Sequence, residues 1–250
     1  MRKQSLYRAL ALFCAIVAFT IVVLVSQHKV KAAPPSGGSI TGMVKLEGTP
    51  PHQKPIDMSK EPTCAAQHKA NPVTTEGVVV GADGGLKNVV VYISQGWSGP
   101  AIASSATPEF DQKGCQYTPH VMAVDEGQHF KVVNSDQTSH NIHPMPTPGG
   151  PNHEWNKSQP PGAPPIDSSW ATQEVAIHVK CNIHPWMSGY MAVVKGPYGV
   201  SDDKGSFTID NIPPGDYTLT AWQETYGTQT QKVTVAAGKP VTANFTFKAK

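Results

Sequence analysis

One short stretch of the sequence combines three kinds of side chain that bind soft metal ions. Cys181, His184 and Met187 lie within a stretch of seven residues, directly after residues 175–179, whose alternating apolar side chains predict a strand. Thiolate and thioether sulfur favour Cu(I), whereas imidazole binds both common oxidation states of copper. This mixture of ligands indicates a copper site.

A second imidazole for such a site is available from residues 138–143, which contain His140 and His143. They follow a predicted strand over residues 129–134. Alternation along the chain places the two histidines on different faces. We expect His140 to face the site and His143 to be exposed or to lie outside the ligand set. The alternative that His143 replaces or supplements His140 stays open.

These motifs and their order resemble the cupredoxins. The loop over residues 181–187 reads Cys-Asn-Ile-His-Pro-Trp-Met and is similar to the copper loop of the amicyanin and plastocyanin type. Residues 124–134 stand where that family has a turn with Gly and a strand ending in Asn before the first His ligand. The resemblance covers about residues 115–196 and implies a Greek-key β-sandwich around one copper ion.

The resemblance also implies roles for individual residues. The ligands of one type 1 (blue) copper would be His140, Cys181, His184 and, as the weak axial ligand, Met187. Asn141 would tie the two ligand loops together by hydrogen bonds near the Cys181 sulfur. Ile142, Pro185 and Trp186 would form an apolar rim through which a redox partner approaches His184. Trp186 stands where amicyanin has Phe.

Two further cysteines, Cys64 and Cys115, predict a disulfide, because an exported chain meets an oxidising environment. The alternative is a second metal site, since His68 follows Cys64 by four residues and His120 follows Cys115 by five. These spacings do not match a compact zinc site, so we favour the disulfide.

The composition favours an all-β fold. The chain contains 22 Gly and 23 Pro among 250 residues, which argues against long helices and for short strands joined by turns. Strands are predicted over residues 40–46, 78–80, 89–93, 129–134, 174–181 and 191–195. The stretch 144–170, rich in Pro, Gly and Asn, is predicted to be a surface loop and a candidate lid or docking surface.

The C-terminal part resembles the carboxypeptidase regulatory-like (transthyretin-like) β-sandwich, through its turn-and-strand motifs over residues 201–209 and 212–219. Two opening strands of that module occur far upstream, over residues 40–44 and 85–91. The resemblance therefore implies a second small antiparallel sandwich that is split along the chain. Its two parts would be residues 38–98 and 197–250, with the copper domain at 115–196 inserted in or adjacent to it.

The N-terminus carries a targeting signal. Three basic residues precede an apolar or small-residue stretch over 9–25, which also contains Cys14, so residues 1–32 predict a helical signal peptide or membrane anchor. The remainder would be exported to the periplasmic or extracellular face, with anchoring to the inner (cytoplasmic) membrane as one possibility. Residues 30–32 resemble a cleavage site, whereas the length of the apolar run favours retention, and both alternatives stay open.

Charge and motifs exclude other classes of function. The net charge of +2 comes from the N-terminus, because the chain after residue 32 has 15 basic and 18 acidic side chains. A nucleic-acid partner is therefore not expected. The sequence contains no His-Glu-x-x-His, Gly-x-Ser-x-Gly or phosphate-binding motif, so we expect no enzyme activity.

The interpretation is an exported copper protein that carries single electrons between redox partner proteins. One alternative is a copper-binding module for sensing or delivery, which would hold copper without cycling it. Another is a structural or carbohydrate-binding sandwich without redox activity, in which Trp155, Trp170 and Trp222 could stack on sugars.

Overall fold

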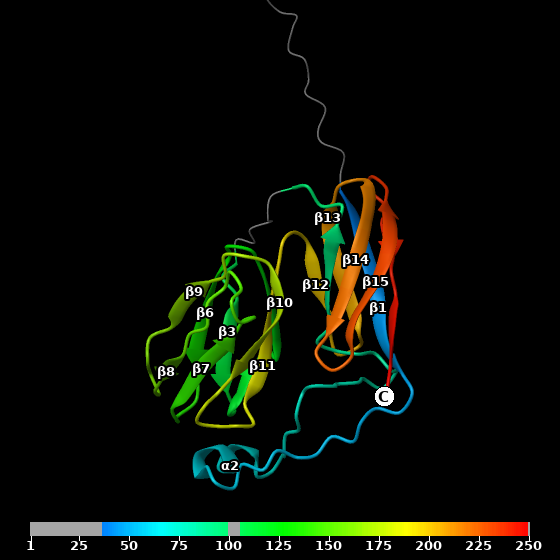
Figure 1. Cartoon of the computed structure of the whole chain (residues 1–250). Coiled ribbons are helices and arrows are strands. Elements are labelled where there is room, and N and C mark those ends of the chain that lie inside the picture. Colours follow the sequence, from blue (N-terminus) through cyan, green and yellow to red (C-terminus); the bar gives the residue numbers. More distant parts are fainter. Residues whose placement is uncertain (1–36, 100–105, 250) are drawn as a thin grey trace, which may run out of the picture. The chain divides into compact units, whose positions relative to one another are not determined.

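The computed structural model describes residues 37–99 and 106–249 (Figure 1). Their regular secondary structure is β-strand apart from one short helix, so the predicted all-β fold class is confirmed. The predicted signal or anchor over residues 1–32 lies outside the described residues. In the described part of the chain, no helix has the length and apolar character needed to cross a bilayer.

One sandwich, called here the split sandwich, takes its strands from both ends of the described chain. The strands are β1 (Gly38–Glu47), β2 (Val90–Gln95), β12 (Tyr198–Val200), β13 (Ser206–Ile212), β14 (Gly215–Gln223), β15 (Gly227–Val235), β16 (Pro240–Thr242) and β17 (Phe245–Lys248). One sheet has the order β13-β1-β16, with β17 also on β1, and the other has the order β12-β2-β14-β15. Strands β1 and β2, from the first part of the described chain, therefore pair in the same sheets as strands β12 to β17, from its last part.

The core of the split sandwich is apolar and is continuous between its sheets. Ile40 of β1, Phe207 of β13 and Leu219 of β14 are all buried in it. The predicted turn before β13 is present, because Asp202 Oδ1 accepts hydrogen bonds from the N–H groups of Lys204 and Ser206. Gly205 closes this turn at a φ of 76°, and a Cβ there would lie 2.2 Å from the Val44 carbonyl oxygen. A larger residue would therefore separate β1 from the turn.

The second sandwich, called here the inserted sandwich, is contiguous in sequence. Its strands are β3 (Glu109–Lys113), β4 (Gln116–Thr118), β5 (Val121–Asp125), β6 (His129–Asn134), β7 (His140–Met145), β8 (Lys157–Gln159), β9 (Ile166–Ser169), β10 (Glu174–Lys180) and β11 (Ser188–Val194). The two sheets have the orders β5-β11-β10-β7-β8 and β4-β3-β6-β9. Phe110, Phe130, Val179 and Met191 are fully buried in its core.

Two sequence expectations about secondary structure were wrong. Residues 144–170 are not a free surface loop, because β8 within them pairs with β7 and β9 pairs with β6. Gln159 and Trp170 from this stretch are buried. The stretch is thus part of the sandwich rather than a lid, and its strands escaped notice because their exposed residues are polar. Residues 78–80 form only an isolated bridge between Val80 and Leu86.

Residues 49–77 connect the first strands and form what we call the covering segment. It contains the helix α2 (Pro62–His68), which the sequence analysis did not predict. Proline at the start of a helix costs no hydrogen bond, because the first N–H groups have no intrahelical acceptor. Met58 and Cys64 of this segment are buried in the core cluster of the inserted sandwich.

Candidate metal centre

Two adjacent strands position the proposed ligands. β7 begins at His140, and β10 ends at Lys180, one residue before Cys181. The two strands are antiparallel, with Lys180 opposite His143, so the start of β7 lies beside the loop that follows β10. That loop runs over residues 181–187 and leads into β11. Residues far apart in sequence therefore meet at one end of the sandwich.

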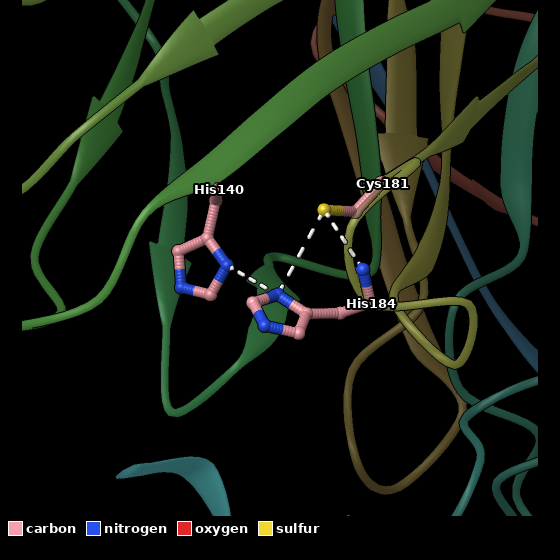
Figure 2. A group of neighbouring side chains, drawn as sticks. All are labelled: His140, Cys181 and His184. Atoms are coloured by element: carbon pink, nitrogen blue, oxygen red, sulfur yellow. Dashed lines mark hydrogen bonds between the residues drawn. The ribbon is translucent and has the colours of Figure 1, made fainter. Parts of the chain in front are cut away.

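Three of the predicted ligands converge there, as Figure 2 shows. His140 Nδ1 lies 2.9 Å from His184 Nδ1, and the Cys181 sulfur lies 3.9 Å from His184 Nδ1. The three ligand atoms all lie within 4.8 Å of one another. Each of the three residues is at most 2% exposed. The cluster is thus buried and compact enough to hold one metal ion.

The hydrogen bonds behind this cluster favour a cation at its centre. His140 Nε2 lies 2.9 Å from the Asp136 carboxylate, which can only accept, so Nε2 carries the proton of the neutral ring. The bare Nδ1 then points at His184 Nδ1 and at the Cys181 sulfur. Because three electron-pair donors face one another in a buried space, the residues fit a soft or borderline metal such as copper.

The electrostatics favour the thiolate that a metal requires. Burial raises the pKa of the Cys181 thiol, but the His140 side chain and the N–H groups of Asn141 and His184 outweigh burial and lower it. Burial likewise opposes charge on His140, yet the hydrogen bond that its ring donates to Asp136 raises its pKa. For His184, burial and then the nearby His140 lower the pKa, which favours a neutral ring.

Asn141 connects the two ligand loops. Its backbone N–H points at the Cys181 sulfur at 3.5 Å, and its side-chain oxygen accepts a hydrogen bond from the Asn182 N–H at 2.6 Å. The Cys181 thiol lies 3.3 Å from the same oxygen. Asn156 in turn accepts a hydrogen bond from the Asn141 amide at 2.6 Å. These bonds fix the sulfur relative to β7.

Met187 lies in the same loop and is 1% exposed. The backbone folds tightly around it: the Met187 N–H donates to the His184 carbonyl, and the Cys181 N–H donates to the Met187 carbonyl. The centroids of the Trp186 and His184 rings lie 5.1 Å apart, and Trp186 Nε1 donates a hydrogen bond to the Cys115 carbonyl. Trp186 therefore joins the ligand loop to the disulfide.

The expected apolar rim around His184 is only partly present, since Trp186 is half-buried. Ile142 is fully buried in the core instead of lining a rim, although Pro185 is exposed. His184 itself is 1% exposed, because Glu61 of the covering segment lies over its outer edge. The segment that covers the site is thus residues 49–77 and not residues 144–170.

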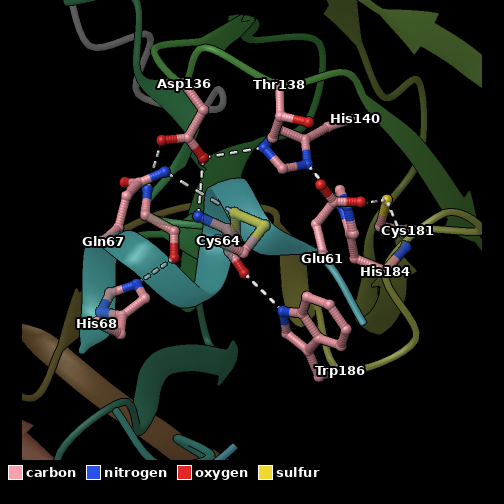
Figure 3. Close-up of a disulfide and its surroundings, with 12 residues drawn as sticks. Glu61, Cys64, Gln67, His68, Asp136, Thr138, His140, Cys181, His184 and Trp186 are labelled. Atoms are coloured by element: carbon pink, nitrogen blue, oxygen red, sulfur yellow. Dashed lines mark hydrogen bonds and ion pairs between the residues drawn. A yellow bond between two sulfur atoms is a disulfide. The ribbon is translucent and has the colours of Figure 1, made fainter. Parts of the chain in front are cut away.

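Cys64 and Cys115 form a disulfide, which holds α2 to the turn between β3 and β4 (Figure 3). His68 contacts the Gly114 carbonyl and His120 pairs with Glu224, so neither histidine joins a cysteine in a second metal site.

His143 lies outside the cluster, between Asn182 and Glu154. Two residues that the sequence analysis missed take part in the site: Asp136 behind His140 and Glu61 beside His184. The spacing of Asp136, four residues before His140, was a weak available signal, whereas nothing local marks Glu61. Trp170 and Trp222 are buried, so they offer no platform for sugars.

The C-terminal resemblance is confirmed by a family model. Residues 195–248 match the carboxypeptidase regulatory-like domain. Among curated proteins, none matches the chain significantly.

The chain is similar to solved copper proteins. One is a Cu-containing nitrite reductase from Thermus scotoductus SA-01, at 15% identity and a TM-score of 0.31, covering 38% of this chain and 25% of the reductase. The chain thus spans about a quarter of that protein's length. Another is a purple cupredoxin from Nitrosopumilus maritimus, at 16% identity and a TM-score of 0.29, covering 35% of this chain and 99% of the cupredoxin. An amicyanin variant in its reduced Cu(I) form matches at 17% identity and a TM-score of 0.31, covering 42% of this chain and 98% of amicyanin.

Proposed function

We propose that this chain is a mononuclear type 1 copper protein that transfers single electrons between redox partner proteins. The observation that carries the proposal is the buried convergence of His140 Nδ1, His184 Nδ1 and the Cys181 sulfur. Met187, from the same loop, is proposed as the axial ligand. Copper bound there would supply a one-electron Cu(II)/Cu(I) couple.

The surrounding residues suit electron transfer because they hold the ligands rigidly. Asp136 orients His140, and the backbone N–H of Asn141 points at the Cys181 sulfur. A ligand set that hardly moves between oxidation states lowers the cost of each electron transfer. The ligand residues are all nearly inaccessible, so the proposed centre offers no open position for a substrate, which favours a carrier over an enzyme.

The rest of the proposal concerns the setting of the site. Residues 38–98 and 197–250 would form one domain, and residues 115–196 the copper domain inserted in it. Residues 1–32 would direct export and, if retained, anchor the protein at the outer face of the cytoplasmic membrane.

The test is to load the full chain with Cu(II) and record its visible spectrum beside that of Cys181→Ser. We expect an intense thiolate-to-copper charge-transfer band that disappears in the variant. His143→Gln is the matched control, because His143 lies next to the site but outside the cluster, and its band should persist. A colourless chain that still binds Cu(I) would favour copper sensing or delivery. A chain that binds neither form would overturn the proposal.

A further inference from the structure

The outer nitrogen of His184 is a buried polar atom without a hydrogen-bond partner among the described residues. His184 turns its Nδ1 toward Cys181 and His140. When Nδ1 binds a metal, the neutral ring must carry its proton on Nε2. A buried N–H without an acceptor lowers the stability of the fold, so a hydrogen-bond acceptor is expected near His184 Nε2.

Glu61 is the carboxylate beside this nitrogen. Its Oε2 lies 3.7 Å from His184 Nε2, slightly beyond hydrogen-bond length. The Glu61 side chain is 31% exposed, whereas the His184 side chain is 2% exposed. Glu61 thus lies between the imidazole and water, and a small rotation of its side chain would bring the two atoms into hydrogen-bond contact.

The position of Glu61 is fixed by its neighbours in the covering segment. Its N–H donates to the Met58 carbonyl, and its own carbonyl accepts from the Ala65 N–H in the first turn of α2. Met58 is buried, and Cys64 is bonded to Cys115 (Figure 3). The backbone that carries Glu61 is therefore held on both sides against the inserted sandwich.

The arrangement at His140 shows what such a carboxylate does. Asp136 Oδ2 lies 2.9 Å from His140 Nε2 and also accepts the Cys115 N–H at 2.7 Å. Each imidazole of the cluster thus has a carboxylate on its outer side, and the Cys64–Cys115 disulfide lies next to both carboxylates. Such outer carboxylates fix the ring tautomer and make the ligand nitrogen a stronger donor.

We propose that Glu61 is the positioning residue of His184: it accepts the Nε2–H and, by its charge, stabilises Cu(II) relative to Cu(I). This inference rests on the proposed copper function and deepens it. The covering segment then has a role in the site itself, because it supplies a carboxylate that neither ligand loop contains.

The test is the copper reduction potential of the full chain and of three variants. Glu61→Gln keeps the shape of the side chain and removes its charge, and we expect the Cu(II)/Cu(I) equilibrium to shift about tenfold toward Cu(I). For a one-electron couple this is a rise of about 59 mV. Glu61→Asp keeps the charge and should recover part of the shift. Glu109→Gln, which removes an exposed carboxylate from β3 of the same sandwich, is the matched control and should leave the potential unchanged.

The outcomes separate this inference from the proposed function. If the wild-type chain has the charge-transfer band and Glu61→Gln has the wild-type potential, the role of Glu61 is wrong and the copper function stands. If Glu61→Gln and Glu61→Asp shift the potential equally, the effect is one of packing and the positioning role is again wrong. A wild-type chain that lacks the band overturns both proposals.

Discussion

The two sandwiches share an all-β architecture but differ in what they bury. In the described chain, the buried histidines and aspartates all belong to the inserted sandwich: His120, Asp125, Asp136, His140 and His184. The main core of the split sandwich is a single apolar cluster that includes Ile40, Phe207 and Leu219. Burying ionisable groups costs stability unless they are paired. The difference therefore marks the inserted sandwich as the part whose interior is shaped by chemistry as well as by packing.

The largest expected difference concerns the disulfide, which joins the covering segment to the inserted sandwich and has no counterpart among the described residues of the split sandwich. Replacing Cys64 and Cys115 by Ser opens a loop with a sequence separation of 51 residues. The free energy of unfolding should fall by about 4 kcal/mol, because the unfolded chain gains entropy. Amide hydrogen exchange measures where protection is lost, and we expect the loss in β3 to β11.

A matched change in the other sandwich is Leu219→Ala, which removes a fully buried side chain from the apolar cluster. It should cost about 3 kcal/mol and leave the copper spectrum unchanged. If either variant lost hydrogen-exchange protection equally in both sandwiches, the two sandwiches would unfold as one unit. The proposed difference between them would then be wrong.

A smaller effect is expected from the buried amides. Gln112 Nε2 donates to Gln159 Oε1 at 2.6 Å in the interior of the inserted sandwich. Gln112→Leu should destabilise the protein by about 2 kcal/mol, because Gln159 loses its donor. Gln229→Leu removes an exposed hydrogen bond from the side-chain amide to the Thr246 carbonyl in the split sandwich. It should change stability by less than about 0.5 kcal/mol. Urea denaturation compares the two, and similar losses would contradict the distinction.

The last expected effect is a dependence on pH. Asp125 is 3% exposed, its Oδ1 has no hydrogen-bond partner among the described residues, and burial raises its pKa from 3.8 to about 6. Between these values the folded state binds more protons than the unfolded state, so this residue makes the protein less stable as the pH rises.

Asp125→Asn should therefore stabilise the protein at neutral pH and have little effect at pH values below the unfolded pKa. Thermal unfolding at several pH values measures this. A gain that is the same at every pH would contradict the role of the buried charge.

Much of this architecture was predictable from local pattern. The alternation over residues 129–134 and 174–181 and the turn at 202–205 are present, since each is determined by neighbours in the sequence. The three converging ligands were also named in advance, because His140, Cys181 and His184 lie in short motifs.

The parts that escaped prediction depend on contacts between distant residues. β8 and β9 have short, mostly polar sequences, and only their pairing with β7 and β6 makes them strands. Helix α2 is seven residues long and is held by the disulfide. Nothing in the sequence near Glu61 marks it, because its role depends on the His184 ring, which lies far along the chain.

The pairing of β1 has a consequence for the order in which the protein can mature. All strands that pair with β1 follow residue 205, whereas the whole inserted sandwich precedes it. During synthesis from the N-terminus, the inserted sandwich can therefore fold before the strands that pair with β1 have been made. A chain interrupted before residue 206 would contain all strands of the inserted sandwich but would leave β1 without its partner strands. Such an unpaired strand edge is a template for aggregation. Pairing of β13, β16 and β17 with β1 removes that unpaired edge.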